Sequence, residues 1–369
     1  MKALQVNKLY YPHIGGVEKH VQDVAEALTD QIDIEVLVAN SDRQAKRETV
    51  SGVTVERVPS WGVVQSAPIA PGFYRAIKQA QADIYHLHFP NPIGELAYLA
   101  AGSPGKLVVT YHADVVRQRH LRRFYGPVIE RLLRRADMIM VSSPNLIESS
   151  EWLRPVREKC RVIPFAIDLG PFQPDPEVTA RAAGFRERFG TPLVLFVGRL
   201  IYYKGLEYLI RAAPDVDAQF IIVGDGIREP ELKALAAELG VAEHFHFVGR
   251  ATDDELPAYY QACDIFTLPS IAESEAFGFV QLEAHACGKP VVSTDLPTGV
   301  PYANLHGETG LIVPSKDHEA LAAALNLLLA DDALRDQLGS RAKERVESDF
   351  SMEAMAREIL RAYQELLAG

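Results

Sequence analysis

The chain has 369 residues and a formal net charge of −11, with 48% apolar and 24% charged residues. This balance is typical of a soluble globular protein of two domains, and no apolar run reaches the ~18 residues that a membrane span requires. The acidic balance disfavours nucleic-acid binding. The three cysteines are scattered and form no C-x-x-C motif. They therefore predict reduced packing residues in a cytoplasmic protein, and neither a disulfide framework nor a zinc site.

The charges are distributed unevenly along the chain. Residues 1–165 hold 21 basic and 17 acidic side chains, a net charge of +4, whereas residues 166–369 hold 17 and 32, a net charge of −15. This asymmetry predicts that the first half faces something anionic.

Short apolar runs alternate with longer amphipathic stretches along almost the whole chain. Strand candidates lie at 3–6, 34–38, 84–88, 107–111, 138–141 and 162–164, and again at 193–198, 220–223, 246–248, 265–268, 290–293 and 311–313. Continuous apolar strands separated by helices predict a parallel sheet covered on both faces. The pattern occurs twice, with a loop rich in proline and acid at 168–177 as the hinge. The expected fold class is therefore α/β, with two doubly wound, Rossmann-like domains.

Residues just after strands are the first candidates for a site, because doubly wound sheets bind ligands beyond the C-terminal ends of their strands. Gly15 and Gly16 follow the first strand and open a helix, where backbone amides can approach an anion. A tight strand-to-helix turn would need these glycines equally. His86 and His88 share one strand face and could form a metal pair, but no third ligand is apparent, so a packed strand end is favoured. By itself, His112 is an ordinary strand-end histidine.

A basic stretch follows in the first half. Between Arg117 and Arg135 lie seven arginines, one histidine and a single acid, Glu130, with apolar residues interleaved. Such a basic amphipathic stretch indicates contact with an anionic membrane surface or with a pyrophosphate-linked acceptor. The alternative is a solvated helix face. The positive balance of the first half favours the membrane.

Two cations follow the first strand of the second half. Arg199 comes directly after this strand, and Lys204 opens the next helix. Because cations at a strand end are costly to bury without an anion, they predict an anionic ligand over a surface salt-bridge pair. Asp215 and Asp217 form a D-x-D motif, which can bind a metal. They precede a strand, at the edge opposite the ligand crevice, and are interpreted as a loop.

The segment 272–284 is the most specific motif. It should run from a loop into a helix, with Glu275 in the loop and Glu283 one to two turns into the helix. The amides of Phe277, Gly278 and Phe279 would form the helix N-terminus, which suits phosphate. Carboxylates accept hydrogen bonds from hydroxyl groups. Phosphate-binding amides, two cations and two carboxylates together match a nucleotide sugar, although a capping acid and a solvated helix acid would explain the carboxylates too.

The motifs together resemble the family-4 retaining glycosyltransferases of the GT-B fold. Glu275 and Glu283 match the E-x7-E motif of that family, and Gly15, Gly16, Arg199 and Lys204 match its other conserved positions. The resemblance implies two domains that face a cleft: an acceptor domain at 1–168 plus 350–369 and a donor domain at 169–349. It also implies that the final helix crosses back to pack on the first domain.

The resemblance further implies a role for each site residue. Arg199 and Lys204 would bind the donor diphosphate, with help from the amides of 277–279. Glu283 would bind the ribose and Glu275 the transferred sugar. His112 would contact that sugar across the cleft, and the base would lie near Gly249 and Arg250.

The donor and acceptor are assigned by a narrower similarity. The runs at 141–146 and 293–301 are similar to bacterial exopolysaccharide and O-antigen mannosyltransferases. We therefore expect mannose transfer from GDP-mannose to a polyprenyl-diphosphate-linked or other glycan acceptor, with retention and without a divalent metal or other cofactor. The enzyme would be cytoplasmic, at the inner face of the membrane. UDP-glucose or UDP-N-acetylglucosamine as donor, a UDP-sugar epimerase, and a non-catalytic nucleotide-sugar-binding protein are the alternatives.

Overall fold

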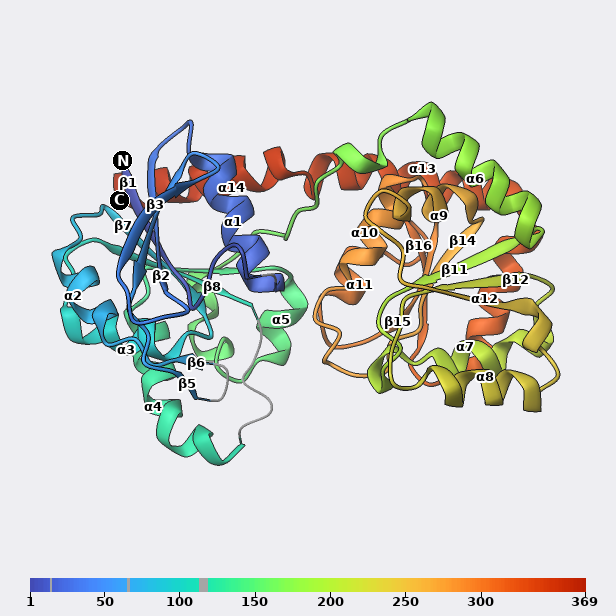
Figure 1. Ribbon diagram of the computed structural model, residues 1–369, viewed down its shortest axis with the longest axis horizontal. Coiled ribbons are helices and arrows are strands. Elements are labelled where there is room, and N and C mark those ends of the chain that lie inside the picture. Colours follow the sequence, from blue (N-terminus) through green and yellow to red (C-terminus); the bar gives the residue numbers. More distant parts are fainter. Residues whose placement is uncertain (14, 65–66, 113–118) are drawn as a thin grey trace. The chain divides into compact units, whose positions relative to one another are not determined.

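The computed structural model describes residues 1–13, 15–64, 67–112 and 119–369, with the side chains of 119–124 left aside. The chain forms two compact units (Figure 1): unit 1 is Met1–Phe165 with Met352–Gly369, and unit 2 is Ala166–Ser351. Each unit is built around one large sheet. Within the described ranges, every helix is too short or too polar to cross a membrane.

An eight-stranded sheet forms the centre of unit 1, in the order β10-β9-β8-β7-β1-β2-β4-β3. Its strands are β1 (Lys2–Val6), β2 (Asp33–Ala39), β3 (Lys46–Val50), β4 (Val53–Val58), β7 (Ile84–Phe89), β8 (Lys106–Tyr111), β9 (Met138–Val141) and β10 (Cys160–Val162). A separate two-stranded sheet pairs β5 (Val63–Val64) with β6 (Ala67–Pro68). Strands β2, β4 and β3 extend the sheet on one side of β1. Strands β7 to β10 extend it on the other side. The β1–β7 boundary is therefore the switch point, where ligands bind in sheets of this kind.

The sequence did not predict β3 and β4. Strand β4 is parallel to β2, and β3 runs antiparallel to β4 at the edge of the sheet. The residues of β3 are exposed or only partly buried, so this strand lacks the continuous apolar run that marks the central strands. The other strand pairs of this sheet are parallel, as predicted, and β3 is the exception.

The helices of unit 1 are α1 (Gly16–Leu28), α2 (Gly72–Gln79), α3 (Pro92–Ala101), α4 (Arg119–Arg135), α5 (Pro144–Ser149) and α14 (Met352–Ala368). Helix α14 packs on α1 and buries Met355, Ile359 and Tyr363, which recur at helical spacing. The Tyr363 hydroxyl hydrogen-bonds His86 Nδ1 on β7 at 2.6 Å. The predicted return of the last helix to the first domain is confirmed.

Unit 2 contains a six-stranded parallel sheet in the order β13-β12-β11-β14-β15-β16. Its strands are β11 (Leu193–Val197), β12 (Gln219–Val223), β13 (Phe245–Gly249), β14 (Ile265–Leu268), β15 (Val291–Asp295) and β16 (Gly310–Pro314). All six strand candidates of the second half are present. The strand order reverses between β11 and β14, which makes their C-terminal ends the switch point of this unit.

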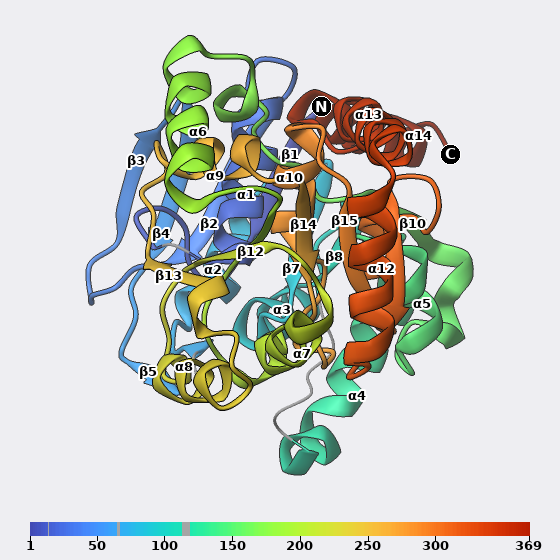
Figure 2. The same cartoon turned by 90° about the vertical axis from the view of Figure 1, so that its right-hand side faces the viewer.

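Helices cover both faces of this sheet. They are α6 (Pro176–Phe189), α7 (Leu206–Ala212), α8 (Glu229–Glu238), α9 (Leu256–Ala262), α10 (Phe279–Ala286), α11 (Val300–Ala303), α12 (His318–Ala330) and α13 (Asp332–Asp349). Helix α12 packs on β15 and β16, and Figure 2 shows it beside β15. Alternate residues of β11 serve opposite cores: Phe196 packs with the α7 and α12 side, and Leu195 with the α6 and α9 side. Because helices cover both faces of the sheet, the sequences of these strands are continuous apolar runs.

Candidate active site

Two side chains at the switch point of unit 2 form a buried ion pair. Lys204 follows β11 and Glu275 follows β14, and these strands are neighbours. Lys204 Nζ lies 2.6 Å from Glu275 Oε2, and each side chain is only 10% exposed. Both charged groups lose hydration, so the presence of the partner is what makes their burial tolerable. The pair places a cation and a carboxylate at the sheet edge where a ligand is expected.

A glycine brings the two loops of this site together. The turn Tyr202–Lys204 leads into α7 at Gly205, which has a φ of +67°. A Cβ atom at Gly205 would lie 2.0 Å from the carbonyl oxygen of Pro269, so only glycine allows the loops to approach this closely. The Lys204 side chain folds back against Gly198 at the end of β11.

Glu275 is held through one of its two oxygens. Ser270 Oγ donates to Glu275 Oε2 at 2.9 Å, and the same oxygen contacts Lys204. Within the described part of the chain, Glu275 Oε1 has no hydrogen-bond partner. The carboxylate is therefore oriented by two contacts and keeps one oxygen for another hydroxyl donor.

Helix α10 begins where the sequence predicted. Gly278 is its N-cap with a φ of +75°, and a Cβ there would lie 2.6 Å from a methyl group of Leu268. The Phe277 side chain is buried in unit 2 beside that of Phe279. Phe277, Gly278 and Phe279 thus stand at a helix N-terminus, where backbone N–H groups and the helix dipole favour an anion.

Glu283, in the second turn of α10, accepts a hydrogen bond from the Tyr260 hydroxyl at 2.6 Å. Burial raises the pKa of Glu283, while the Tyr260 hydrogen bond and the Lys204 charge oppose that rise. Lys204, which is in contact with Glu275, therefore also favours the charged form of Glu283. Glu283 is not the solvated helix acid of the simpler interpretation.

Arg199 follows β11 and Arg250 follows β13, the two strands on either side of β12, and both side chains are exposed. Arg199 contacts the Tyr203 hydroxyl at 3.5 Å and forms no ion pair with any described residue. Arg250 Nε is 3.9 Å from Asp225 Oδ2, and its side chain is 80% exposed. The adjoining backbone is close-packed, because the Gly224 N–H donates to the Gly249 carbonyl at 2.7 Å. Both arginines are therefore available to an anionic ligand.

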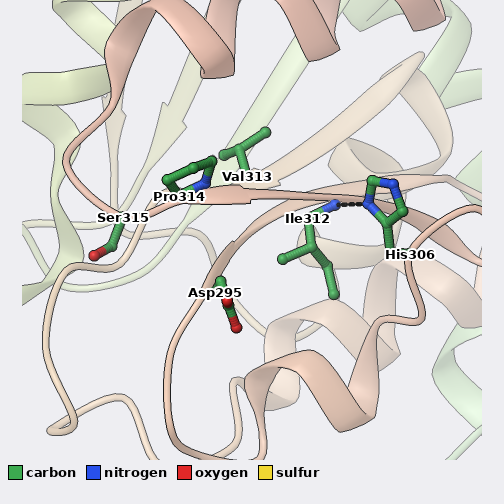
Figure 3. Close-up of a pocket in the computed structure, with 6 residues that line it drawn as sticks. All are labelled: Asp295, His306, Ile312, Val313, Pro314 and Ser315. Atoms are coloured by element: carbon green, nitrogen blue, oxygen red, sulfur yellow. Dashed lines mark hydrogen bonds between the residues drawn. The ribbon is translucent and has the colours of Figure 1, made fainter.

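A pocket of about 650 Å³ opens at the ends of β15 and β16 (Figure 3). Its lining consists of Asp295, His306, Ile312, Val313, Pro314 and Ser315. The His306 ring is fixed, since its Nδ1 accepts the Ile312 N–H at 2.9 Å. The pocket lies at the same sheet edge as Glu275, two strands along from β14, but none of the predicted site residues lines it.

In unit 1, Gly15 and Gly16 stand at the start of α1. Gly15 is the N-cap in an extended conformation, and its carbonyl accepts the Lys19 N–H at 2.9 Å. The Glu18 carboxylate occupies the space into which a Cβ at Gly15 would project. A larger residue here would require the Glu18 side chain to move, and an anion at the helix start would meet the charge of Glu18.

His112 follows β8 and is 8% exposed. Its Nε2 lies 3.1 Å from His88 Nδ1, and the His20 ring of α1 stands edge-on to it at a centroid distance of 5.2 Å. Burial holds the pKa of His112 and His88 well below the usual range and lowers that of His20 to about 4. All three rings are therefore neutral at pH 7.

The two histidines on β7 have different surroundings. His86 is a packed strand residue, with Nδ1 bonded to Tyr363 and Nε2 to Thr110 Oγ1, each at 2.6 Å. His88, however, is joined by His20 and His112 in a cluster of possible metal ligands. His20, a third possible ligand that was not apparent from the sequence, comes from α1, a helix that the sequence pattern did not connect with β7.

The basic stretch is described only in part. Arg117 lies outside the described residues, as do the side chains of the arginines at 119, 122 and 123. In the remainder of α4, Ile129, Leu132 and Leu133 are buried in the core of unit 1. Arg134 pairs with Glu130 at 2.6 Å. This half of the helix offers exposed charge, and its apolar face is already occupied.

The D-x-D residues lie where the sequence predicted. Asp215 ends a short 3₁₀ turn before β12, and its carbonyl oxygen accepts a hydrogen bond from Asn326 at 2.7 Å. Asp217 is exposed in the same loop. Both precede β12, at the edge of the sheet away from Lys204 and Glu275.

The sequence analysis missed three residues of these clusters. Ser270 orients Glu275, Tyr260 binds Glu283, and His20 joins His88 and His112. Ser270 carries a usable signal, because it follows β14 by two residues. Tyr260 and His20 lie on helices among apolar residues, and only the fold shows what they contact.

Comparisons with known proteins agree with this architecture. The Glycosyltransferase Family 4 model matches residues 14–170, and the Glycosyl transferases group 1 model matches residues 183–345. A D-rhamnosyltransferase of Pseudomonas aeruginosa is 36% identical over 355 residues, which cover 95% of this chain and 92% of that protein. An O-antigen chain mannosyltransferase of Escherichia coli is 31% identical over 371 residues, covering 100% and 99%.

Solved structures show the same fold. Sucrose-phosphate synthase of Thermosynechococcus elongatus matches with a TM-score of 0.78 at 25% identity, covering 100% of this chain and 99% of that chain. HepE of Anabaena, in complex with UDP, matches with a TM-score of 0.80 at 21% identity, covering 99% and 100%. The chain therefore belongs to the family-4-type glycosyltransferases of the GT-B fold, enzymes that transfer a sugar to an acceptor.

Proposed function

We propose that this glycosyltransferase transfers mannose from GDP-mannose to a lipid-linked or other glycan acceptor in cell-surface polysaccharide synthesis, with retention at the anomeric carbon. The E. coli relative is named an O-antigen chain mannosyltransferase. A further relative, from Mycolicibacterium smegmatis, is 29% identical and is named a GDP-mannose-dependent phosphatidylinositol monomannoside mannosyltransferase. These names support mannose as the sugar and a lipid-linked molecule as the acceptor.

The buried contact between Lys204 and Glu275 is the observation that carries the proposal. A donor bound here would place its diphosphate against Lys204 and the exposed Arg199, beside the N-terminus of α10. Glu275 Oε1 would accept a sugar hydroxyl, while Ser270 and Lys204 hold the carboxylate in position. As the glycosidic bond breaks, negative charge grows on the diphosphate, and the two cations stabilise it.

Two further contacts complete the proposed donor site. Glu283 binds the ribose hydroxyls, oriented by Tyr260. The base lies near Gly249 and Arg250. The proposed scheme assigns no residue as a covalent nucleophile. The acceptor therefore attacks the anomeric carbon on the face from which the diphosphate departs. The assignment of His112 to the transferred sugar remains a prediction from the family resemblance.

Transfer without a divalent metal is part of the proposal. Lys204, Arg199 and the α10 amides supply positive charge at the diphosphate, which is the role that a metal has in other glycosyltransferases. Activity is therefore expected to persist in excess EDTA. Complete loss in EDTA, with recovery on adding Mg²⁺ or Mn²⁺, would contradict this and direct attention back to Asp215 and Asp217.

Peripheral binding to the inner face of the membrane is proposed from charge. Arg131, Arg134 and Arg135 are exposed on α4, and basic side chains are attracted to anionic lipid. Because the apolar face of this part of α4 is packed in unit 1, the contact would be electrostatic. Cosedimentation with phosphatidylglycerol vesicles should weaken as salt rises and when all three arginines become alanine. Salt-insensitive binding, or equal binding to neutral phosphatidylcholine vesicles, would contradict it.

Transfer of D-rhamnose is the second candidate, because the 36% identical Pseudomonas relative is named a D-rhamnosyltransferase. D-rhamnose is mannose without its 6-hydroxyl group, so the two donors would share every other contact. The test is transfer from radiolabelled GDP-mannose, GDP-D-rhamnose, UDP-glucose and UDP-N-acetylglucosamine to a lipid-linked glycan. Mannose transfer with a kcat/KM above that of the other donors is expected. Preference for a UDP-sugar, or donor binding without transfer, would overturn the proposal.

A further inference from the structure

Three histidines meet at the switch point of unit 1. His20 comes from α1, which follows β1; His88 lies on β7; and His112 follows β8. Their exposed fractions are 7%, 0% and 8%. One ring nitrogen of each histidine lies within 4.8 Å of one nitrogen of each of the other two. This is a convergence of three buried imidazoles from three different elements.

The three rings have far fewer hydrogen bonds than their nitrogens could form. Among the described residues they make a single one, between His88 Nδ1 and His112 Nε2 at 3.1 Å. His88 Nε2 is fully buried and has no partner, and neither nitrogen of His20 has one within the described part of the chain. Buried polar atoms are normally satisfied, because leaving one without a partner costs roughly 1–3 kcal/mol.

His86, two residues from His88 on the same strand face, provides an internal comparison. Both of its nitrogens are paired, one with Tyr363 and one with Thr110. A histidine that has only a packing role in this sheet therefore has two hydrogen-bond partners. In contrast, His88 is paired only with His112, and His20 with no described residue, so other protein groups do not hold these rings in place.

We propose that His20, His88 and His112 form a binding site for one divalent ion of the Zn²⁺ class. Neutral imidazoles are ligands for Zn²⁺, Co²⁺ and Ni²⁺ and not for Mg²⁺ or Ca²⁺. Ligand nitrogens ~2.0–2.1 Å from a tetrahedral zinc lie roughly 3.3 Å from one another. His88 Nδ1 and His112 Nε2, 3.1 Å apart, already meet this spacing, and an ion would replace the hydrogen bond between them. One nitrogen of each of the three rings lies within 4.8 Å of the others.

The surroundings set the strength and openness of the site. Among the described residues no carboxylate belongs to the cluster, and the positive charge of Lys8 acts on His112. The ion would therefore bind more weakly than at sites with acidic ligands. The Phe165 ring stacks on His112 at an interplanar angle of 13° and also contacts His20, which limits access of water. Three ligands leave the fourth position of a tetrahedral ion open.

Occupation of this site would affect transfer. The inference at this step rests on the proposed function, in which His112 contacts the transferred sugar. An ion bound to His112 would take the ring away from that contact, so Zn²⁺ should inhibit transfer over the concentration range in which it binds.

Metal binding to the full chain tests the site without any donor. Equilibrium dialysis with Zn²⁺ and with Co²⁺ should show one ion per chain, with visible Co²⁺ absorption of a nitrogen-ligated site, whereas Mg²⁺ should not compete. His20→Gln and His88→Gln should each weaken binding at least roughly tenfold. His318→Gln, on α12 in unit 2, is the matched control and should bind as the wild type does. Absence of saturable binding, or equal binding by all variants, would overturn the site.

The second measurement is the ratio of transfer rates with and without Zn²⁺, which cancels any change in basal rate. His20→Gln, whose ring is nearer the surface than that of His88, keeps the test available if His88→Gln does not fold. A ratio that falls in the wild type and much less in His20→Gln supports the inhibitory role. Full activity with the site occupied overturns the inhibitory role. It also counts against His112 as a contact of the transferred sugar. The donor assignments in unit 2 are tested separately.

Discussion

Lys204 Nζ and Glu275 Oε2 are 2.6 Å apart in a buried contact that joins the loop after β11 to the loop after β14. Each of these residues is proposed to bind a different part of the donor, yet each also neutralises the other. A substitution at either position therefore changes the stability of unit 2 as well as the site. Arg199, which is exposed and has no ionic partner among the described residues, does not have this double role.

Lys204→Ala should lower stability as well as transfer. Removing one partner of a buried ion pair leaves an uncompensated charge, at a cost of roughly 3–5 kcal/mol. Adding Glu275→Gln removes that charge and should recover part of the loss in thermal stability, without restoring transfer. Equal melting temperatures for the single and double variants would show that the pair does not stabilise the fold.

Arg199→Ala should remove transfer and leave the fold intact. Loss of one group that stabilises transition-state charge costs roughly 10²–10³ in kcat, while an exposed substitution changes stability by only about ±0.5 kcal/mol. Arg211→Ala, an exposed arginine on α7, is the matched control. Near-normal turnover in Arg199→Ala would exclude the arginine from the diphosphate site.

Tyr260→Phe should change the pH dependence of donor binding. The Tyr260 hydrogen bond lowers the pKa of Glu283 against the effect of burial, so its removal raises that pKa further. Protonation of Glu283 weakens acceptance of a ribose hydrogen bond. The KM for the donor should therefore rise on acidification, and the rise should begin at a higher pH in the variant. Identical KM profiles in both proteins would separate Glu283 from donor binding.

Glu95 should make unit 1 less stable as pH increases. Its carboxyl group is buried on α3, and burial raises its pKa to about 7 although Tyr125 and Asn91 donate hydrogen bonds to it. Between about pH 4.5 and pH 7 the folded state keeps a proton that the unfolded chain has released. Stability therefore falls by about 3 kcal/mol across this window and is constant above it.

Glu95→Gln isolates this contribution, because glutamine imitates the protonated acid. The difference in thermal stability between variant and wild type should move in favour of the variant from pH 5 to pH 8. Other titrating groups are common to both proteins and cancel. A difference that does not depend on pH would show that the Glu95 pKa is not raised.

The sequence was sufficient for the central strands, because each is buried on both faces and therefore apolar along its length. It was insufficient for β3, whose edge position allows charged residues such as Lys46. It was also insufficient for β4, which lies between β2 and β3 and alternates buried valines with partly buried polar residues such as Glu56. It also placed Lys204 and Glu275 each after a strand. Their contact depends on β11 lying beside β14, a neighbour relationship between strands about seventy residues apart in the sequence that local patterns do not contain.

The same limit applies to the histidines. His88 and His112 lie at the ends of neighbouring strands, and their proximity can be inferred from the sequence. His20 lies on an amphipathic helix. That it faces β7 follows only from the packing of α1 on the sheet. Contacts between a helix and a strand that is distant in sequence are therefore the part of such a site that a single sequence does not reveal.

The position of α14 in the sequence, after unit 2, limits how the protein can be divided into fragments that fold independently. Residues 1–165 expressed alone would lack the helix that buries Ile359 and supplies Tyr363 to His86, so this fragment should be aggregation-prone while 166–351 folds independently. Adding a synthetic 352–369 peptide in trans should rescue the fragment. During synthesis, unit 1 likewise cannot complete its core until α14 has left the ribosome, after unit 2 has been made.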